Sequence, residues 1–324
     1  MYEKINLMGK DFLKLNNFFF FTKKFLDFVL EPMIPNEPIF LQIEPTTKCN
    51  LKCIMCNLTK SKKDMTFEDF KYIITQFKEL RFIRFQGIGE PLLNRELIKF
   101  IKFSSEKNIK TSIITNGLLI KKPLLRKLND SGLNHLGISI DSPSKKNYER
   151  IRRGGKFKEI TKNLETISNM KDELNFNTEI FTVVMEENLS ELMNMIDFCE
   201  RFKINDIFFN LRNELKLTKE IKKTVLEVSK KSKESGINSR ILLPINHIKR
   251  KCKWPWIGTY VTVEGYVTAC CMQSDFNKIN FGNIFHKNFE SIWKGKEYRN
   301  FRYRLKNDIP QFCQRCHRCK TSYF

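Results

Sequence analysis

The strongest constraint in this sequence is a short segment that contains three cysteines, Cys49, Cys53 and Cys56. Three residues separate the first two and two separate the last two, so a single loop can present three thiolates to one metal centre. Thiolates suit iron and sulfide, and three of them can hold three corners of a cubane iron–sulfur cluster. The fourth iron is then open to a ligand that is not protein. A zinc site would ordinarily close with a fourth Cys or His nearby, but the next such residue, His135, is far along the chain.

The composition is that of a large globular protein. With 324 residues, of which 41% are hydrophobic and 12% aromatic, the chain can form one large or two moderate domains. Its ten cysteines cluster in short spacings and we expect no signal peptide, so metal ligation in a reducing cytoplasm is favoured over disulfides. Charged residues follow the phenylalanine run at 18–21, which predicts an amphipathic helix and no transmembrane segment. A role at a membrane surface stays open.

The net charge of +22 is compatible with an acidic partner such as RNA, a nucleotide-linked substrate or an anionic membrane. The lysines are nevertheless dispersed along segments that are typical of solvated helix faces. No compact basic motif with interleaved aromatic residues is present in the sequence, so nucleic acid is not the expected partner.

From about residue 39, apolar β-rich runs alternate with amphipathic ones, which indicates an α/β fold with a parallel sheet. The first helix is expected to begin at Thr66 with a capping arrangement. Six strands followed by helices fit a partial (β/α)6 TIM-like barrel, in which the loops at the carboxyl ends of the strands carry the chemistry. The predicted strands span residues 39–43, 82–86, 110–114, 135–140, 177–184 and 206–209.

Three regions follow from this pattern: an N-terminal helical extension over 1–38, the partial barrel over 39–245 and a small α+β domain over 246–324. The pattern breaks over about 229–250, where Lys, Ser, Gly and Pro accumulate, and the last boundary is placed there. Beyond it, residues 260–268 predict a hairpin around a Glu-Gly turn, and residues 289–305 predict one amphipathic helix.

The three-cysteine segment resembles the Cys-x3-Cys-x2-Cys loop of the radical S-adenosylmethionine (radical SAM) superfamily. In that family the amino and carboxylate groups of SAM chelate the open iron of a 4Fe-4S cluster, and the cluster reduces the sulfonium to release a 5′-deoxyadenosyl radical. The resemblance implies that Cys49, Cys53 and Cys56 hold the catalytic cluster. It also implies SAM as a cofactor and an electron donor such as flavodoxin or ferredoxin.

Polar motifs at the ends of the next three predicted strands extend the resemblance. The turn Gly87-Ile88-Gly89-Glu90-Pro91 resembles the Gly-Gly-Glu-Pro motif that contacts the SAM amino group, although its glycines are not adjacent. Thr115-Asn116-Gly117 and Ser139-Ile140-Asp141 resemble the family's Thr-Asn-Gly and Ser-x-Asp elements; ordinary turn chemistry is the alternative. The residues carried over as SAM contacts are Gly89, Glu90, Asn116, Ser139 and Asp141.

Arg152 is a further candidate, as a partner for the SAM carboxylate. It follows a short segment, Tyr148 to Ile151, that continues the family resemblance. The alternative for Arg152 is an arginine on a helix surface.

A second group of cysteines lies near the C-terminus. Four thiolates, two of them in a Cys-x2-Cys pair, can enclose a complete cubane without an open iron, and a four-cysteine zinc site is the alternative. The pattern resembles the SPASM and shorter twitch extensions of radical SAM enzymes. Cys271 and Cys319 are too few for another set, which argues for one auxiliary 4Fe-4S cluster; Cys199 is interpreted as a core cysteine. The predicted ligands are Cys252, Cys270, Cys313 and Cys316.

The sequence therefore predicts a cytoplasmic radical SAM enzyme that oxidises or crosslinks a small, sugar-like molecule or a peptide. The alternatives are an RNA-modifying radical SAM enzyme and a non-catalytic iron–sulfur or zinc protein. SAM binding by the purified protein would separate the last of these from the others.

Overall fold

The computed structural model describes residues 37–56, 61–212, 215, 218–241, 252–270, 275–307 and 310–314. The predicted N-terminal extension lies almost entirely outside the described residues, as does the predicted domain boundary at 245. Both stay predictions. Within the described residues, no helix is long and apolar enough to cross a membrane.

The strands form one open sheet in the order β7-β6-β5-β4-β3-β2-β1-β8-β9. Neighbours are parallel from β7 through to β8, and β9 runs antiparallel to β8. The strands of the described residues are β1 (Phe40–Ile43), β2 (Phe82–Phe85), β3 (Lys110–Thr115), β4 (His135–Ser139), β5 (Asn177–Val184), β6 (Asp206–Leu211), β7 (Asn238–Ile241), β8 (Gly258–Val261) and β9 (Val267–Thr268).

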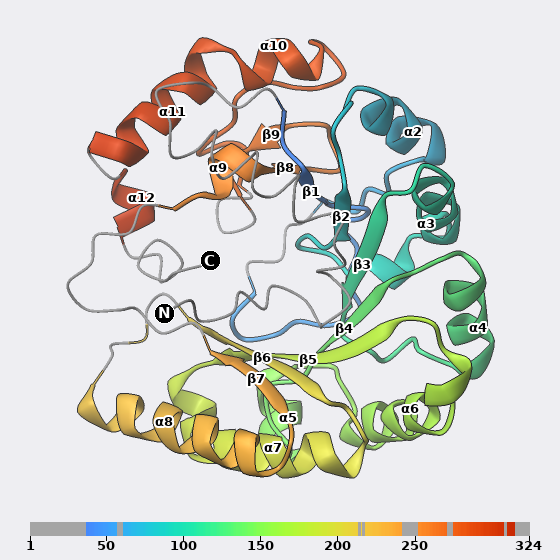
Figure 1. Cartoon of the computed structure of the whole chain (residues 1–324), viewed down its shortest axis with the longest axis vertical. Helices are drawn as coiled ribbons and strands as arrows, with labels where there is room; N and C mark the ends of the chain where they lie inside the picture. Colours follow the sequence, from blue (N-terminus) through green and yellow to red (C-terminus); the bar gives the residue numbers. More distant parts are fainter. Residues whose placement is uncertain are drawn as a thin grey trace.

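Helices alternate with the parallel strands and line the outer face of the curved sheet (Figure 1). This arrangement confirms the predicted α/β partial barrel, which brings the carboxyl ends of its strands to one edge. The α-helices are α2 (Phe67–Thr75), α3 (Leu97–Glu106), α4 (Lys122–Asp130), α5 (Lys145–Ile151), α6 (Phe157–Asn169), α7 (Leu192–Arg201), α8 (Lys219–Glu234), α9 (Trp254–Ile257), α10 (Phe289–Trp293), α11 (Lys296–Asn307) and α12 (Gln311–Gln314). Short 3-10 turns occur at Pro91–Leu93, Lys171–Glu173 and Glu186–Glu191.

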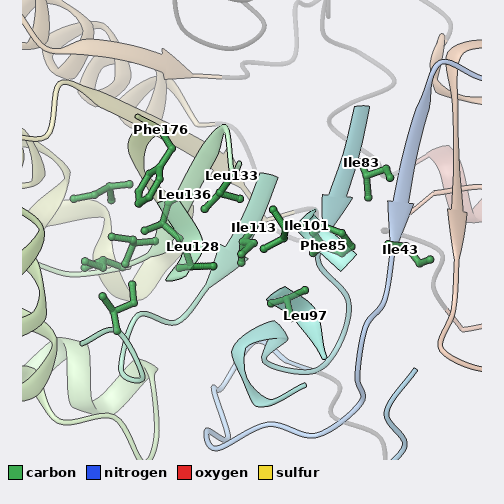
Figure 2. Close-up of a cluster of buried hydrophobic side chains, with 14 of the residues drawn as sticks. Ile43, Ile83, Phe85, Leu97, Ile101, Ile113, Leu128, Leu133, Leu136 and Phe176 are labelled. Carbon is green, nitrogen blue, oxygen red and sulfur yellow. The ribbon is translucent and has the colours of Figure 1, made fainter. Parts of the chain in front are cut away.

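The core lies between the sheet and these helices. Alternate strand residues such as Ile113 of β3 and Leu136 of β4 are completely buried against Ile101 of α3 and Leu128 of α4, as Figure 2 shows. Burying one such side chain contributes roughly 1.5–3 kcal/mol, so the strands and helices form a stiff frame. That frame determines where the loops at the strand ends can lie.

Two local predictions are confirmed. Thr66 is the N-cap of α2, and its hydroxyl accepts a hydrogen bond from the Asp69 amide at 3.1 Å. The predicted hairpin forms from β8 and β9, and Gly265 in its turn adopts a φ of +84°, which favours glycine.

The region around 229–250 was predicted as a break in the pattern, but α8 continues to Glu234 and β7 adds a seventh parallel strand beside β6. The prediction was wrong here because β7 is an edge strand. Its residues are only partly buried or exposed, so it lacks the apolar run by which the other strands are recognised.

The helix predicted over 289–305 is in fact two helices, α10 and α11, separated at Gly295. A Cβ atom at Gly295 would lie 2.6 Å from the Ser291 carbonyl oxygen, so the chain turns too tightly for another residue. The amphipathic pattern continues across the break because both helices pack on the same cluster, through Ile292 and Trp293 of α10 and Tyr298 of α11.

Candidate active site

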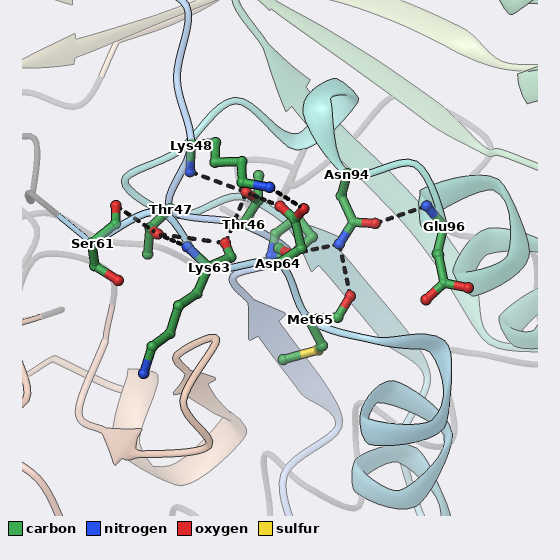
Figure 3. Close-up of polar contacts among 10 residues, drawn as sticks. Thr46, Thr47, Lys48, Ser61, Lys63, Asp64, Met65, Asn94 and Glu96 are labelled. Carbon is green, nitrogen blue, oxygen red and sulfur yellow. Dashed lines mark hydrogen bonds and ion pairs between the residues drawn. The ribbon is translucent and has the colours of Figure 1, made fainter.

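The three-cysteine loop begins directly after β1, at the carboxyl edge of the sheet. A dense set of polar contacts holds its first residues (Figure 3). The Thr46 hydroxyl donates to Asp64 Oδ1 at 2.6 Å, and the Lys48 ammonium pairs with Asp64 Oδ2 at 2.5 Å. The Asn94 amide donates to the carbonyls of Pro45 and Met65 at 2.7 and 2.9 Å. The loop is therefore anchored before its first cysteine.

All three thiols of the loop are free, and two local hydrogen bonds shape it. The Leu51 amide donates to Cys49 Sγ at 3.5 Å, and the Cys56 amide donates to the Cys53 carbonyl at 3.1 Å. Desolvation raises the pKa of each thiol, and repulsion from the Cys53 and Cys49 thiolates helps to raise that of Cys56 to about 11. A metal cation is therefore needed to favour the three thiolates over the thiols and to offset the repulsion between the thiolates.

The Gly87–Pro91 turn packs directly on the cysteine loop. A Cβ atom at Gly89 would lie 2.2 Å from the Thr46 carbonyl oxygen, so only glycine fits this contact, and the Glu90 amide donates to the Lys48 carbonyl at 2.7 Å. The turn was predicted to bring backbone atoms close to a ligand, and in the structure Gly89 brings them close to the cysteine loop. Its contact with SAM stays a prediction.

The carboxylate of Glu90 is buried and binds the next loop. It accepts hydrogen bonds from the Thr115 hydroxyl at 2.6 Å, from the Asn116 amide at 2.7 Å and from the Leu92 amide at 3.2 Å. Burial raises the pKa of Glu90 despite these bonds. Glu90 therefore organises the Thr115–Gly117 loop, a role that sequence reasoning, which assigned it to SAM, did not predict.

Asn116 links the loop after β3 to the cysteine loop after β1. Its side-chain amide donates to Asn50 Oδ1 at 2.8 Å, in the interval between Cys49 and Cys53, while Asn116 Oδ1 accepts from the Leu118 amide at 3.1 Å. The loops after β1, β2 and β3 are thus joined by direct hydrogen bonds, as the shared edge of a parallel sheet allows.

Asp141 and Arg152 form a buried ion pair. Arg152 Nη2 lies 2.8 Å from Asp141 Oδ2, and Asp141 Oδ1 accepts from the Val183 amide at 2.8 Å. Arg152 is 6% exposed, so the alternative of a helix-surface arginine is wrong. Ser139, the last residue of β4, is half-buried and its hydroxyl forms no side-chain hydrogen bond to any residue that the structure describes.

Arg152 also acts on the cysteine loop. Its charge works against the burial that raises the pKa of the Cys53 thiol, and the amides of Lys52 and Ile54 donate to the carbonyls of Arg153 and Ile151 at 2.8 and 3.0 Å. Burial lowers the pKa of Arg152, but nearby negative groups, Asp141 and Cys53 first, outweigh this effect and leave its pKa raised. The guanidinium is therefore a permanent positive charge beside the thiols.

These residues fit a cubane cluster with a bound anionic ligand. The loop offers three free thiols, and Arg152 Nε is buried without a hydrogen-bond partner in the described part of the chain. No three His, Cys, Asp or Glu side chains among the described residues are grouped closely enough to hold a single metal ion. In a cubane, each thiolate binds a different iron.

Three of the predicted C-terminal ligands, Cys252, Cys270 and Cys313, lie within the described residues. Cys313 is buried in a second apolar cluster with Trp256, Phe301 and Leu305, and Cys252 packs against it. Burial raises the pKa of Tyr298 to about 12, and the thiols of Cys270 and Cys252 add to this increase. Cys252 therefore lies against the cluster that contains Cys313, and Cys252 and Cys270 both lie near Tyr298. The other predicted ligand, Cys316, and the unassigned Cys271 and Cys319 lie outside the described residues.

Sequence reasoning missed three polar residues that assemble the site: Glu44, Asn50 and Thr115. Glu44 was the easiest of the three to predict, because it is a carboxylate directly after the apolar strand β1. In the structure it is buried, with 2% of its surface exposed. Asn50 and Thr115 were visible only as parts of motifs, since their partners are distant in the sequence. Cys199 is completely buried in α7, which confirms its prediction as a core cysteine.

Removing the carboxylate of Asp141 is expected to destabilise the metal-free protein strongly. The Asp141→Ala change leaves the buried Arg152 charge without its partner, which costs about 3–5 kcal/mol of unfolding free energy. Asp197→Ala is the control, because its pair with Lys231 has a carboxylate that is 55% exposed and is worth less than about 1 kcal/mol. Urea unfolding of both variants measures the difference, and equal losses would contradict the buried pair.

Comparison with known proteins agrees with this arrangement. Residues 43–199 match the radical SAM superfamily, and residues 252–320 match SPASM, an iron–sulfur cluster-binding domain. The chain is 24% identical to the PqqA peptide cyclase of Rhizobium meliloti over 88% of its own length and 81% of that protein. It is also 24% identical to the tungsten-containing aldehyde ferredoxin oxidoreductase cofactor-modifying protein of Pyrococcus furiosus, over 86% of each chain.

The fold is similar to that of Streptococcus suis SuiB in its complex with the precursor peptide SuiA. The TM-score is 0.69 with 18% sequence identity, and the match covers 99% of this chain and 79% of SuiB. The chain belongs to the radical SAM superfamily and is an enzyme of that class. Within the superfamily it is a SPASM-containing member, whose cofactors are SAM, a SAM-binding 4Fe-4S cluster and an auxiliary iron–sulfur centre.

Proposed function

We propose that this enzyme oxidises or crosslinks a peptide, with Cys49, Cys53 and Cys56 as the ligands of the SAM-binding cluster. The observation that carries the assignment is that hydrogen bonds join the loop of three free thiols to the turns after β2 and β3 and to the end of α5, where the Arg152 guanidinium is buried. When bound, the cluster and SAM supply reductive cleavage of the sulfonium and hydrogen-atom abstraction from the substrate.

The residues of the chain would bind and orient these groups. Gly89 brings backbone close to the cysteine loop, and Glu90 and Asn116 hold the loops after β2 and β3 against it. Arg152, held by Asp141, provides a fixed positive charge toward an anionic group such as the SAM carboxylate. Ser139, with a hydroxyl that bonds to no described side chain, is available to a ligand. Cys252, Cys270, Cys313 and Cys316 would hold the auxiliary cluster.

A peptide substrate is supported by relatives that match most of the chain. Those relatives include a PqqA peptide cyclase and a protein whose structure contains a precursor peptide. A small molecule is the second candidate, because the chain is equally identical to a cofactor-modifying protein. An electron donor such as flavodoxin or ferredoxin would supply the reducing electron.

We expect the product to be lighter than the substrate by two hydrogens, or newly crosslinked. The physical reason is that an auxiliary cluster can accept the second electron once a hydrogen atom has been removed. With deuterium at the reacting carbon, mass spectrometry should find the label in 5′-deoxyadenosine and one 5′-deoxyadenosine per product. Regeneration of SAM, or a product of unchanged mass without a new bond, would contradict the assignment of an oxidative reaction.

The substrate class is tested separately by incubating the reconstituted enzyme with short peptides encoded beside its gene. Modification of a peptide, detected by mass, supports the proposal. Modification of a sugar or nucleotide metabolite with all peptides unchanged would favour the small-molecule candidate.

A further inference from the structure

Glu44 is a buried carboxylate that none of the proposed catalytic roles uses. It follows β1 directly and lies five positions before Cys49. Its side chain is 2% exposed and accepts two backbone hydrogen bonds from segments that are far apart in the sequence. Those segments are the glycine turn after β2 and the hairpin of β8 and β9.

The first hydrogen bond holds the glycine turn. The Ile88 amide donates to Glu44 Oε1 at 2.8 Å, in the middle of the turn from Gly87 to Glu90. A Cβ atom at Gly87 would lie 2.4 Å from Glu44 Cγ, so the turn closes directly over this side chain. Glu44 therefore contacts the turn at Gly87 and Ile88, whereas the cysteine loop contacts it at Gly89 and Glu90.

The second hydrogen bond reaches the C-terminal region. The Val263 amide donates to Glu44 Oε2 at 3.3 Å, and β8 pairs in parallel with β1 immediately before this point. The hairpin continues through β9 to Cys270, two residues beyond the end of that strand. One carboxylate thus joins the turn beside the first cysteine group to the hairpin that leads to the second.

We propose that Glu44 is a positioning residue that couples the SAM-binding turn to the auxiliary-cluster hairpin. Desolvation makes a buried carboxylate unfavourable, and it raises the pKa of Glu44 despite the two amide bonds. A residue needed only for packing would not require two buried acceptor oxygens. A carboxylate is suited to the task because each of its two oxygens can accept from a different segment.

Hydrogen exchange of the metal-free protein tests the connection without any cofactor. Glu44→Ala should accelerate amide exchange in two peptides, one around Ile88 and one around Val263. In Glu44→Gln the single amide oxygen can replace only one acceptor, and the shorter bond to Ile88 should keep it. The glutamine variant should therefore accelerate exchange around Val263 alone.

Glu179→Gln is the matched control. Glu179 is equally buried, at 1% exposed, but it lies near the amino end of β5 and contacts His135 of β4 and Arg240 of β7. Amide exchange around Ile88 and Val263 in the Glu179→Gln variant should equal that of the parent protein. If Glu44→Ala unfolds globally, Glu44→Gln decides: acceleration around Val263 alone supports the coupling, and any other pattern overturns it.

Affinity for SAM tests the consequence, which rests on the proposed function. In anaerobically reconstituted protein, Glu44→Ala should raise the SAM dissociation constant about tenfold or more, as for other groups that orient a binding residue, while Glu179→Gln leaves it unchanged. Changed exchange with unchanged SAM affinity would overturn the coupling. Failure of the parent protein to bind SAM would instead overturn the proposed function, and the exchange result would stand.

Discussion

Replacing Cys53 with alanine is expected to abolish the cleavage of SAM to 5′-deoxyadenosine by anaerobically reconstituted, reduced enzyme. Cys53 is the central thiol of the loop, and its loss leaves two thiolates, too few to hold a cubane with one open iron. The measurement is chromatography of 5′-deoxyadenosine together with the iron content of the variant.

Cys199→Ala is the control for this experiment. Cys199 is completely buried in α7 and belongs to the hydrophobic core, so its replacement removes a thiol without touching the loop. It should cost about 1 kcal/mol of stability and leave SAM cleavage at the parent level. Full cleavage by the Cys53→Ala protein would show that this loop does not hold the catalytic cluster.

The second large effect concerns iron content. We expect about eight irons per chain after reconstitution and about four in the Cys313→Ala/Cys316→Ala double variant, because two independent cubanes carry four irons each. Cys313 is 8% exposed, so its thiol is directed into the protein and not into solvent. SAM cleavage should persist in the double variant, since its first cluster is intact.

Metal analysis of the parent protein separates the two kinds of C-terminal site. One zinc with only four irons would identify a four-cysteine zinc site, which uses the same ligands. In the double variant, loss of SAM cleavage together with four irons would mean that the two centres depend on each other. The proposed pair of clusters requires about eight irons in the parent protein and about four in the double variant, with SAM cleavage retained.

Much of the site was predictable because its motifs are local. The three cysteines lie within eight residues, and a polar turn follows each of the strands β1, β2, β3 and β4. Edge strand β7 was missed because partial burial removes the apolar signal. The helix break at Gly295 was missed because the apolar pattern of α10 and α11 continues through it.

The contacts of individual side chains were not predictable in the same way. Glu90 was assigned to SAM, yet its carboxylate accepts bonds from Thr115 and Asn116. Arg152 could have been a surface residue, yet it is buried beside Asp141. In each case the partner is separated from the residue by eleven to twenty-six positions, and nothing local specifies the pairing.

The sequence by itself determined the chemistry and the class of fold: three thiols with an open position, and alternating apolar and amphipathic runs that fold into a parallel sheet. Only the tertiary structure decided how the loops are joined. The pairing of β8 with β1 brings the C-terminal hairpin beside the first loop, so that Glu44 contacts both Ile88 and Val263. The physical reason is that periodicity and spacing act within one segment, whereas a buried carboxylate takes its hydrogen bonds from whichever segments packing brings to it.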